Sequence, residues 1–88
     1  MKAKEVKGKN FKIINEYGIS YKLKNKNLNP NHNVGYLFHK EDLEVQNFEV
    51  GNNDMWFVMK DLDGEYFAQP IHSKAMLISI LSGPWEKY

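Results

Sequence analysis

Residues 55–70 read Met-Trp-Phe-Val-Met-Lys-Asp-Leu-Asp-Gly-Glu-Tyr-Phe-Ala-Gln-Pro, and this stretch decides the fold class. Two runs rich in apolar and aromatic residues flank a short polar segment, which is the pattern of a β-hairpin. Asp61 at the first position and Gly64 at the fourth suit a type I turn followed by a left-handed residue, a conformation that glycine adopts without a Cβ penalty. The sequence therefore predicts a central hairpin over residues 55–70.

This turn fixes which residues of the predicted hairpin face one another. With Asp61 opposite Glu65, successive side chains alternate between the two faces of the strands. Both faces are then apolar, so each must be covered by the rest of the sheet, by a helix or by another molecule. The expected pairs are Lys60 with Tyr66, Met59 with Phe67, Val58 with Ala68, and Phe57 with Gln69; one face carries Met55, Phe57, Met59 and Phe67, and the other carries Trp56, Val58, Tyr66 and Ala68.

The chain of 88 residues has the length of one small domain, and we expect residues 1–88 to form a single one. It has no cysteine, which excludes disulfides and thiolate metal sites, so packing alone must stabilise the domain. The lysine-rich residues 1–9 are expected to be flexible, and no apolar run of a signal peptide follows them. No stretch approaches the roughly 20 apolar residues of a membrane span. We therefore expect a soluble, cytoplasmic protein without membrane contact.

The charged residues are unusual in kind and in distribution. All twelve cations are lysines, and without arginine the chain lacks the bidentate fork that grips phosphates and reads guanine edges, which disfavours sequence-specific nucleic-acid recognition. Residues 1–26 hold eight lysines and two glutamates, a net charge of +6, whereas residues 41–65 hold eight carboxylates and one lysine, a net charge of −7. The two segments either form opposite poles or pair within one sheet and neutralise each other.

Residues 10–24 predict a first hairpin with the same turn chemistry as the central one. Apolar and polar residues alternate on both sides of the segment from Asn15 to Gly18, which repeats an asparagine at the first turn position and a glycine at the fourth. The expected solvent face is a lysine strip of Lys12, Lys22 and Lys24, with Tyr17 at the turn. This strip suits either an ordinary solvated face or a contact with an anion or a nucleic acid.

The middle of the chain contains a loop and two short strands. Residues 25–35 are an asparagine-rich loop by composition, and the apolar run from Val34 predicts a strand through His39. Residues 40–43 suit a single helical turn, and a short strand is expected around residues 44–50.

Residues 34–45, Val-Gly-Tyr-Leu-Phe-His-Lys-Glu-Asp-Leu-Glu-Val, are preceded by the amphipathic hairpin and resemble the small SH3-like barrels of Gram-positive bacteria and their phages. In those proteins a strand that ends in an aromatic residue runs into a one-turn helix and an Asp-Leu-Glu step. The resemblance covers residues 8–50. It implies a small antiparallel barrel that serves as an adaptor or binds nucleic acids or peptides, and it assigns no catalytic residue.

Residues 73–82 predict a helix that begins after Ser73 as the N-cap and stops at Gly83 and Pro84. Its apolar residues cover most of the circumference, so the helix either plugs the concave side of the sheet or meets a partner with part of its surface. The β-branched residues of this segment leave a strand as the alternative. The predicted fold is mainly β with one C-terminal helix: a small antiparallel SH3-like sheet or partial barrel built from two or three hairpins, with the helix packed on it.

The sequence offers little catalytic or metal-binding chemistry. His32, His39 and His72 are never three or four residues apart, so we expect no metal site and no cofactor. His39 near carboxylates, or His72 beside Ser73, are the remaining candidates for a small hydrolase or deaminase, but the chain has neither a nucleophile elbow nor a phosphate-binding glycine loop. We therefore expect that the protein is not an enzyme.

Aromatic residues exceed what one small core needs, and tyrosine and tryptophan are typical anchors of protein interfaces. They also suit the closure of barrel ends, and Trp85 and Tyr88 are expected to fold back on the sheet. The candidates for partner contact are Tyr36, Trp56, Tyr66, Trp85 and Tyr88.

These observations predict a small non-enzymatic protein-binding domain. The lysine-only cations and ten asparagines suggest an AT-rich genome and suit a phage or mobile-element accessory protein that binds and inhibits or modulates a host or defence protein. The expected partner is a protein, with self-association as a further option. The alternative is an SH3-like nucleic-acid-binding protein that uses the lysine strip and Tyr17.

Overall fold

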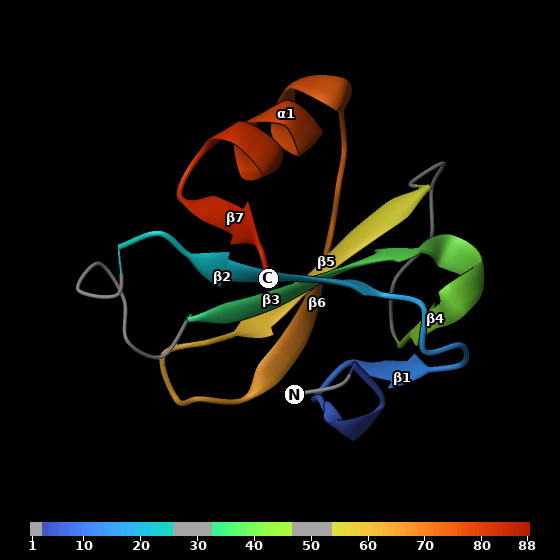
Figure 1. Ribbon diagram of the computed structural model, residues 1–88. Coiled ribbons are helices and arrows are strands. Elements are labelled where there is room, and N and C mark those ends of the chain that lie inside the picture. Colours follow the sequence, from blue (N-terminus) through green and yellow to red (C-terminus); the bar gives the residue numbers. More distant parts are fainter. Residues whose placement is uncertain (1–2, 26–32, 47–53) are drawn as a thin grey trace.

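The computed structural model describes residues 3–25, 33–46 and 54–88, whose strands form two antiparallel sheets (Figure 1). One sheet has five strands in the order β6-β5-β3-β2-β7, and the other consists of β1 and β4. The mainly β fold with one C-terminal helix is thus confirmed. In chain order the elements are η1 (Ala3–Glu5), β1 (Phe11–Ile13), β2 (Ile19–Leu23), β3 (Val34–His39), η3 (Lys40–Asp42), β4 (Leu43–Val45), β5 (Met55–Lys60), β6 (Tyr66–Pro70), α1 (Lys74–Ser82) and β7 (Trp85–Lys87).

Strands β5 and β6 form the predicted central hairpin in the predicted register. The Asp61 N–H donates to the Glu65 carbonyl at 2.8 Å, and Gly64 has the expected left-handed φ of +81°. The Asp61 carboxylate also accepts hydrogen bonds from the N–H groups of Asp63 at 2.9 Å and Glu65 at 3.0 Å. Backbone and side chain therefore close this turn together, which explains why the local sequence was sufficient to predict it.

Each face of the central hairpin is buried under a different part of the chain. The five-stranded sheet is the middle layer of three, with α1 on one face and η1, β1 and β4 on the other (Figure 1). The first core contains Ala3, Val6, Phe11, Tyr36, Phe38, Leu43, Trp56, Val58, Tyr66 and Ala68; the second contains Tyr21, Leu23, Leu37, Phe57, Ile71 and Trp85, against which Met55, Met59, Met76, Leu77 and Ile80 pack.

The predicted hairpin over residues 10–24 is wrong in its pairing, although both of its strands exist. Strand β1 pairs with β4, so Lys12 lies opposite Glu44, whereas β2 pairs with β3 and β7. The chain leaves the small sheet at Ile14, whose N–H donates to the Asp42 carbonyl at 2.9 Å. This arrangement covers the first core and places Lys12 opposite a carboxylate, a cross-strand pair of opposite charges.

Gly18 has a different role from the predicted turn glycine. Among the described residues only Gly64 is a glycine with a positive φ. A Cβ atom on Gly18 would lie 2.6 Å from the ring of Phe38. Glycine is needed at this position because the chain passes close to the first core.

Residues 3–9 contain the 3-10 helix η1 and pack on the first core, whereas the sequence led us to expect flexibility over residues 1–9; residues 1 and 2 lie outside the described part. Ala3 and Val6 are both buried in the first core. The Lys9 N–H donates to the Tyr66 carbonyl at 3.0 Å. Two apolar anchors and pairing with β6 therefore suffice to hold a segment in which lysines are frequent.

The other predicted elements are largely confirmed. Helix α1 begins after Ser73, whose hydroxyl accepts a hydrogen bond from the Met76 N–H at 3.1 Å. The predicted helical turn is the 3-10 helix η3. Strand β3 spans the predicted strand and begins at Val34, so the loop predicted over residues 25–35 extends two residues too far. Residues 26–32 of that loop and residues 47–53, including the end of the strand expected around residues 44–50, lie outside the described ranges.

The turn of the central hairpin predicts a pH dependence of stability. The Lys9 ammonium donates to Asp61 at 2.7 Å, and this bond, with the N–H groups of Glu65 and Asp63, holds the pKa of the Asp61 carboxyl below its ordinary value. A carboxyl with a lowered pKa in the folded state stabilises the fold above its unfolded pKa of about 3.9 and loses that contribution as the pH falls through the folded pKa.

We therefore expect Asp61→Asn, which retains a turn-forming side chain, to lower the free energy of unfolding near neutral pH and to approach the wild type in strong acid. Urea unfolding between about pH 6 and pH 2 measures this difference. Lys9→Gln should flatten the same pH profile, whereas Lys24→Gln should not. An identical acid-induced loss in the wild type and in Asp61→Asn would contradict the assignment.

Candidate protein-binding surface

The edge of the five-stranded sheet along β6 is closed by the N-terminal segment. The Asn10 side-chain oxygen accepts a hydrogen bond from the Ala68 N–H at 3.0 Å, and the Asn10 amide nitrogen donates to the Ala68 carbonyl at 3.2 Å. Gly8 forms a β-bridge with Tyr66, and Pro70 has no N–H. The outward positions of β6 therefore offer no open ladder to another strand.

Among the described residues, no strand pairs with the opposite edge of the sheet, along the outer side of β7, which we call the open edge. Lys22 pairs with Glu86 in β7, the Lys24 N–H donates to the Pro84 carbonyl at 2.7 Å, and the Tyr88 N–H donates to the Ser20 carbonyl at 2.9 Å. In this antiparallel register residues 84, 86 and 88 turn their backbone groups toward β2. The N–H and carbonyl groups of residues 85 and 87 consequently point away from the sheet, and no residue of the described chain forms a strand beside them.

Charged and aromatic side chains lie along the open edge. The Lys22 ammonium is 3.6 Å from the Glu86 carboxylate and lies 5.8 Å from the centre of the Tyr88 ring. Tyr88 is 71% exposed. Both partners of the ion pair are also exposed, so this ion pair contributes little to stability and leaves both side chains available to another molecule.

Helix α1 exposes two large apolar side chains to solvent, beside Lys74, Ser79 and Ser82, in addition to the apolar side chains that face the sheet. Met76, Leu77 and Ile80 pack against the second core, whereas Ile78 is 61% exposed and Leu81 is 44% exposed. Residues three apart on a helix are neighbours on its surface, so these two side chains lie together. Helix α1 lies above β7 in Figure 1, and we define the C-terminal surface as Ile78, Leu81 and the outer edge of β7. The Tyr88 ring is near Lys22, which alternates with Tyr21 and Leu23 of the second core, so it lies on the other face of the sheet.

Four of the five aromatic candidates for partner contact are buried, which corrects their assignment from sequence. Tyr36, Trp56 and Tyr66 lie in the first core and Trp85 lies in the second, so Tyr88 alone of the five is exposed. Burial raises the pKa of the Tyr36 hydroxyl to about 12. The number of aromatic residues exceeds what one core needs, but a sheet covered on both faces has two cores, and both contain aromatic side chains.

The predicted lysine strip is divided between the two sheets. Lys22 lies in β2 and Lys24 directly follows its end, whereas Lys12 lies opposite Glu44 in the small sheet, and Tyr17 is exposed in the connection between β1 and β2. Together with the ion pair of Lys9 and Asp61, the Lys12 pairing joins the basic segment to the acidic one. The two segments therefore neutralise each other in part, which was one of the two arrangements that the sequence left open.

Sequence reasoning missed the roles of Asn10, Glu86 and Lys87. The partner of Asn10 is 58 residues away, so no local pattern indicates the contact. Strand β7 had no clear signal, because Trp85-Glu86-Lys87-Tyr88 does not alternate apolar and polar side chains after the Gly-Pro stop.

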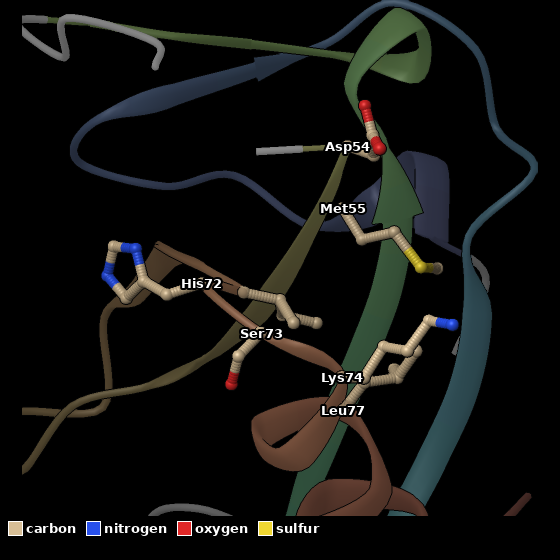
Figure 2. Close-up of a pocket in the computed structure, with 7 residues that line it drawn as sticks. Asp54, Met55, His72, Ser73, Lys74 and Leu77 are labelled. Atoms are coloured by element: carbon tan, nitrogen blue, oxygen red, sulfur yellow. The ribbon is translucent and has the colours of Figure 1, made fainter. Parts of the chain in front are cut away.

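A pocket of about 220 Å³ lies between the start of β5 and the first turn of α1 (Figure 2). Figure 2 shows the His72 ring and the Ser73 hydroxyl pointing in different directions. The Ser73 hydroxyl caps α1, and His39 is exposed at the end of β3. The pocket therefore offers no support for a His72–Ser73 catalytic pair. Its lining residues are Asp54, Met55, Ile71, His72, Ser73, Lys74 and Leu77.

Within residues 3–25, 33–46 and 54–88, no three histidine or acidic side chains are grouped so that they could hold a metal ion. In the same ranges no helix has the length and apolar character needed to cross a bilayer.

The chain matches no protein-family model, no curated protein and no solved structure. The resemblance of residues 8–50 to SH3-like barrels therefore stays a prediction. Function must be argued from the surface of this molecule.

The closed edge predicts that Asn10→Ala destabilises the protein. The variant removes both hydrogen bonds to Ala68 and leaves a partly buried N–H and carbonyl without their partner, which costs about 1–2 kcal/mol. Asn15→Ala, at an exposed position in the connection between β1 and β2, is the control and should change the free energy of unfolding by less than about 0.5 kcal/mol. Equal effects of the two substitutions in urea unfolding would show that Asn10 does not close the β6 edge.

Proposed function

We propose that the chain is a small non-enzymatic protein-binding domain that contacts its partner with the C-terminal surface. The observation that carries the proposal is the exposure of Ile78 and Leu81 on a helix whose other side already covers the second core. Covering apolar surface contributes roughly 25 cal/mol per Å², so a partner that packs on this side of α1 gains affinity from it. Tyr88 adds an exposed ring after β7, on the face of the sheet away from α1, and tyrosine is a frequent anchor of protein interfaces.

The distribution of charge favours a protein partner over a nucleic acid. Lys9, Lys22 and Lys40 each lie within 4 Å of a carboxylate, at distances of 2.7, 3.6 and 3.5 Å. Nucleic-acid binding depends on lysines and arginines that neutralise phosphates, and this chain contains no arginine. The alternative function, nucleic-acid binding through the lysine strip, retains exposed Lys22 in β2 and exposed Lys24 just after it as its support.

The biological setting is part of the same proposal. We place the domain in the cytoplasm as an accessory protein of a phage or mobile element that inhibits or modulates a host or defence protein. The support is compositional: twelve lysines without arginine, ten asparagines and no cysteine. The resemblance of residues 8–50 to SH3-like adaptors agrees with a binding role.

The proposal is tested by affinity capture from a lysate of Gram-positive bacterial cells, with and without nuclease, followed by mass spectrometry. We expect a stoichiometric protein partner that survives nuclease, is lost with Ile78→Lys and is retained with Leu62→Lys, which alters an exposed apolar side chain in the turn between β5 and β6. Proteins that disappear after nuclease treatment would instead support the lysine strip. A partner that Ile78→Lys and Leu62→Lys retain equally would rule out the C-terminal surface.

A further inference from the structure

We infer that the open edge of β7 binds an extended segment of the partner as an added antiparallel strand, with an acidic residue opposite Lys87 and a basic residue opposite Glu86. The inference rests on the proposed function and adds the conformation and the charge pattern of the bound segment.

The backbone of β7 presents hydrogen-bonding groups on its outer side that no described strand pairs. Trp85 and Lys87 each turn one N–H and one carbonyl outward, and they are separated by one residue along an extended strand. Such alternation matches the hydrogen-bonding side of another β-strand, because each residue of a hydrogen-bonded antiparallel pair exchanges both of its backbone groups with its partner. Addition of a peptide to an exposed sheet edge is a known mode of recognition in which main-chain hydrogen bonds supply affinity.

The two edges of the five-stranded sheet differ in their protection. Natural sheets protect their edges because unpaired strands invite pairing with other chains. Here Asn10 and Pro70 protect β6, at the cost of fixing the N-terminal segment along it. No described segment runs beside β7 on its outer side, so β7 is the edge at which a strand can be added.

Glu86 and Lys87 place opposite charges at adjacent positions of β7. Both side chains are exposed and alternate between the two faces of the sheet. Cross-strand pairs of opposite charge stabilise a sheet, and like charges directly opposite destabilise it. An added antiparallel strand runs from the position opposite Lys87 to the position opposite Glu86. These two residues therefore favour a segment in which an acidic residue is followed directly by a basic one.

The same charges oppose pairing with a second copy of the chain. A two-fold axis through Glu86 would place two glutamates opposite each other, and an axis through Lys87 would do the same for two lysines. An axis through Trp85 would place Lys87 against the turn at Gly83 and Pro84, which is not extended strand. Charge complementarity thus favours a segment of a different protein.

The experiment uses random decapeptides displayed on phage and selected against the full-length protein. The binding of selected peptides is then measured by fluorescence anisotropy for the wild type and two variants. Lys87→Pro removes the outward N–H but no hydrogen bond to β2, because residue 87 turns its backbone away from β2. Lys87→Ala removes the charge and keeps the N–H, so the pair separates the backbone contact from the side-chain contact.

We expect selected peptides to share an acidic residue followed by a basic one, and to lose roughly tenfold in affinity with Lys87→Pro. Lys87→Ala should weaken binding by less than about fivefold, the effect expected for one cross-strand charge pair, and should relax the preference for the acidic residue. Equal losses with Lys87→Ala and Lys87→Pro, or the absence of any selected binder, would overturn the inference.

Hydrogen exchange of the wild type tests strand addition independently of whether the Lys87→Pro variant folds. At saturating peptide the Lys87 amide should become protected from hydrogen exchange, and an amide that stays unprotected would overturn strand addition.

If Ile78→Lys abolishes capture of the lysate partner and a folded Lys87→Pro variant does not, the proposed function is supported and strand addition at β7 is ruled out. If neither variant affects capture, both fall. A dimer of the wild type that Lys87→Pro dissociates would identify a second copy as the occupant and also overturn the inference.

Discussion

Trp56 and Phe57 are neighbours on β5, point to opposite faces of the sheet and are both buried. Because successive residues of a strand alternate between faces, this pair requires a cover on each side of the sheet. The N-terminal turn and the small sheet provide one cover, and α1 provides the other. The pairing of β1 with β4, the packing of the N-terminal segment on the first core and the position of α1 all follow from the same requirement.

The elements that the sequence predicted are those that local chemistry determines. Asp61 and Gly64 close a turn by contacts within five residues, and Ser73 caps α1 three residues ahead of its donor. The partner of β1 could not be predicted in this way, because Asn15 and Gly18 offer a convincing local turn while the stabilising contacts lie in β4, about 30 residues away along the chain. Which aromatic residues remain exposed is harder to predict, because it depends on which of them are buried in the two cores.

Burial on both faces also determines what remains for function. A domain of 88 residues that fills two cores uses most of its aromatic residues, and Tyr36, Trp56, Tyr66 and Trp85 are unavailable at the surface. The N-terminal segment closes the β6 edge while it covers the first core, so Asn10 serves the fold and limits pairing at the same time. The C-terminal surface combines an open strand edge with exposed apolar side chains. Its charges, Glu86 and Lys87, add discrimination between partners, because a strand with the wrong order of charges is repelled.

One edge of the described sheet is closed by Asn10 and the other, along β7, is open, and amide hydrogen exchange of the free protein tests this difference most directly. We expect slow exchange at Ala68, whose N–H donates to Asn10, and at Glu86, whose N–H faces β2. The Lys87 amide, which points outward, should exchange at least about tenfold faster than the other two. A Lys87 amide as protected as Glu86, or an Ala68 amide as unprotected as Lys87, would contradict the account.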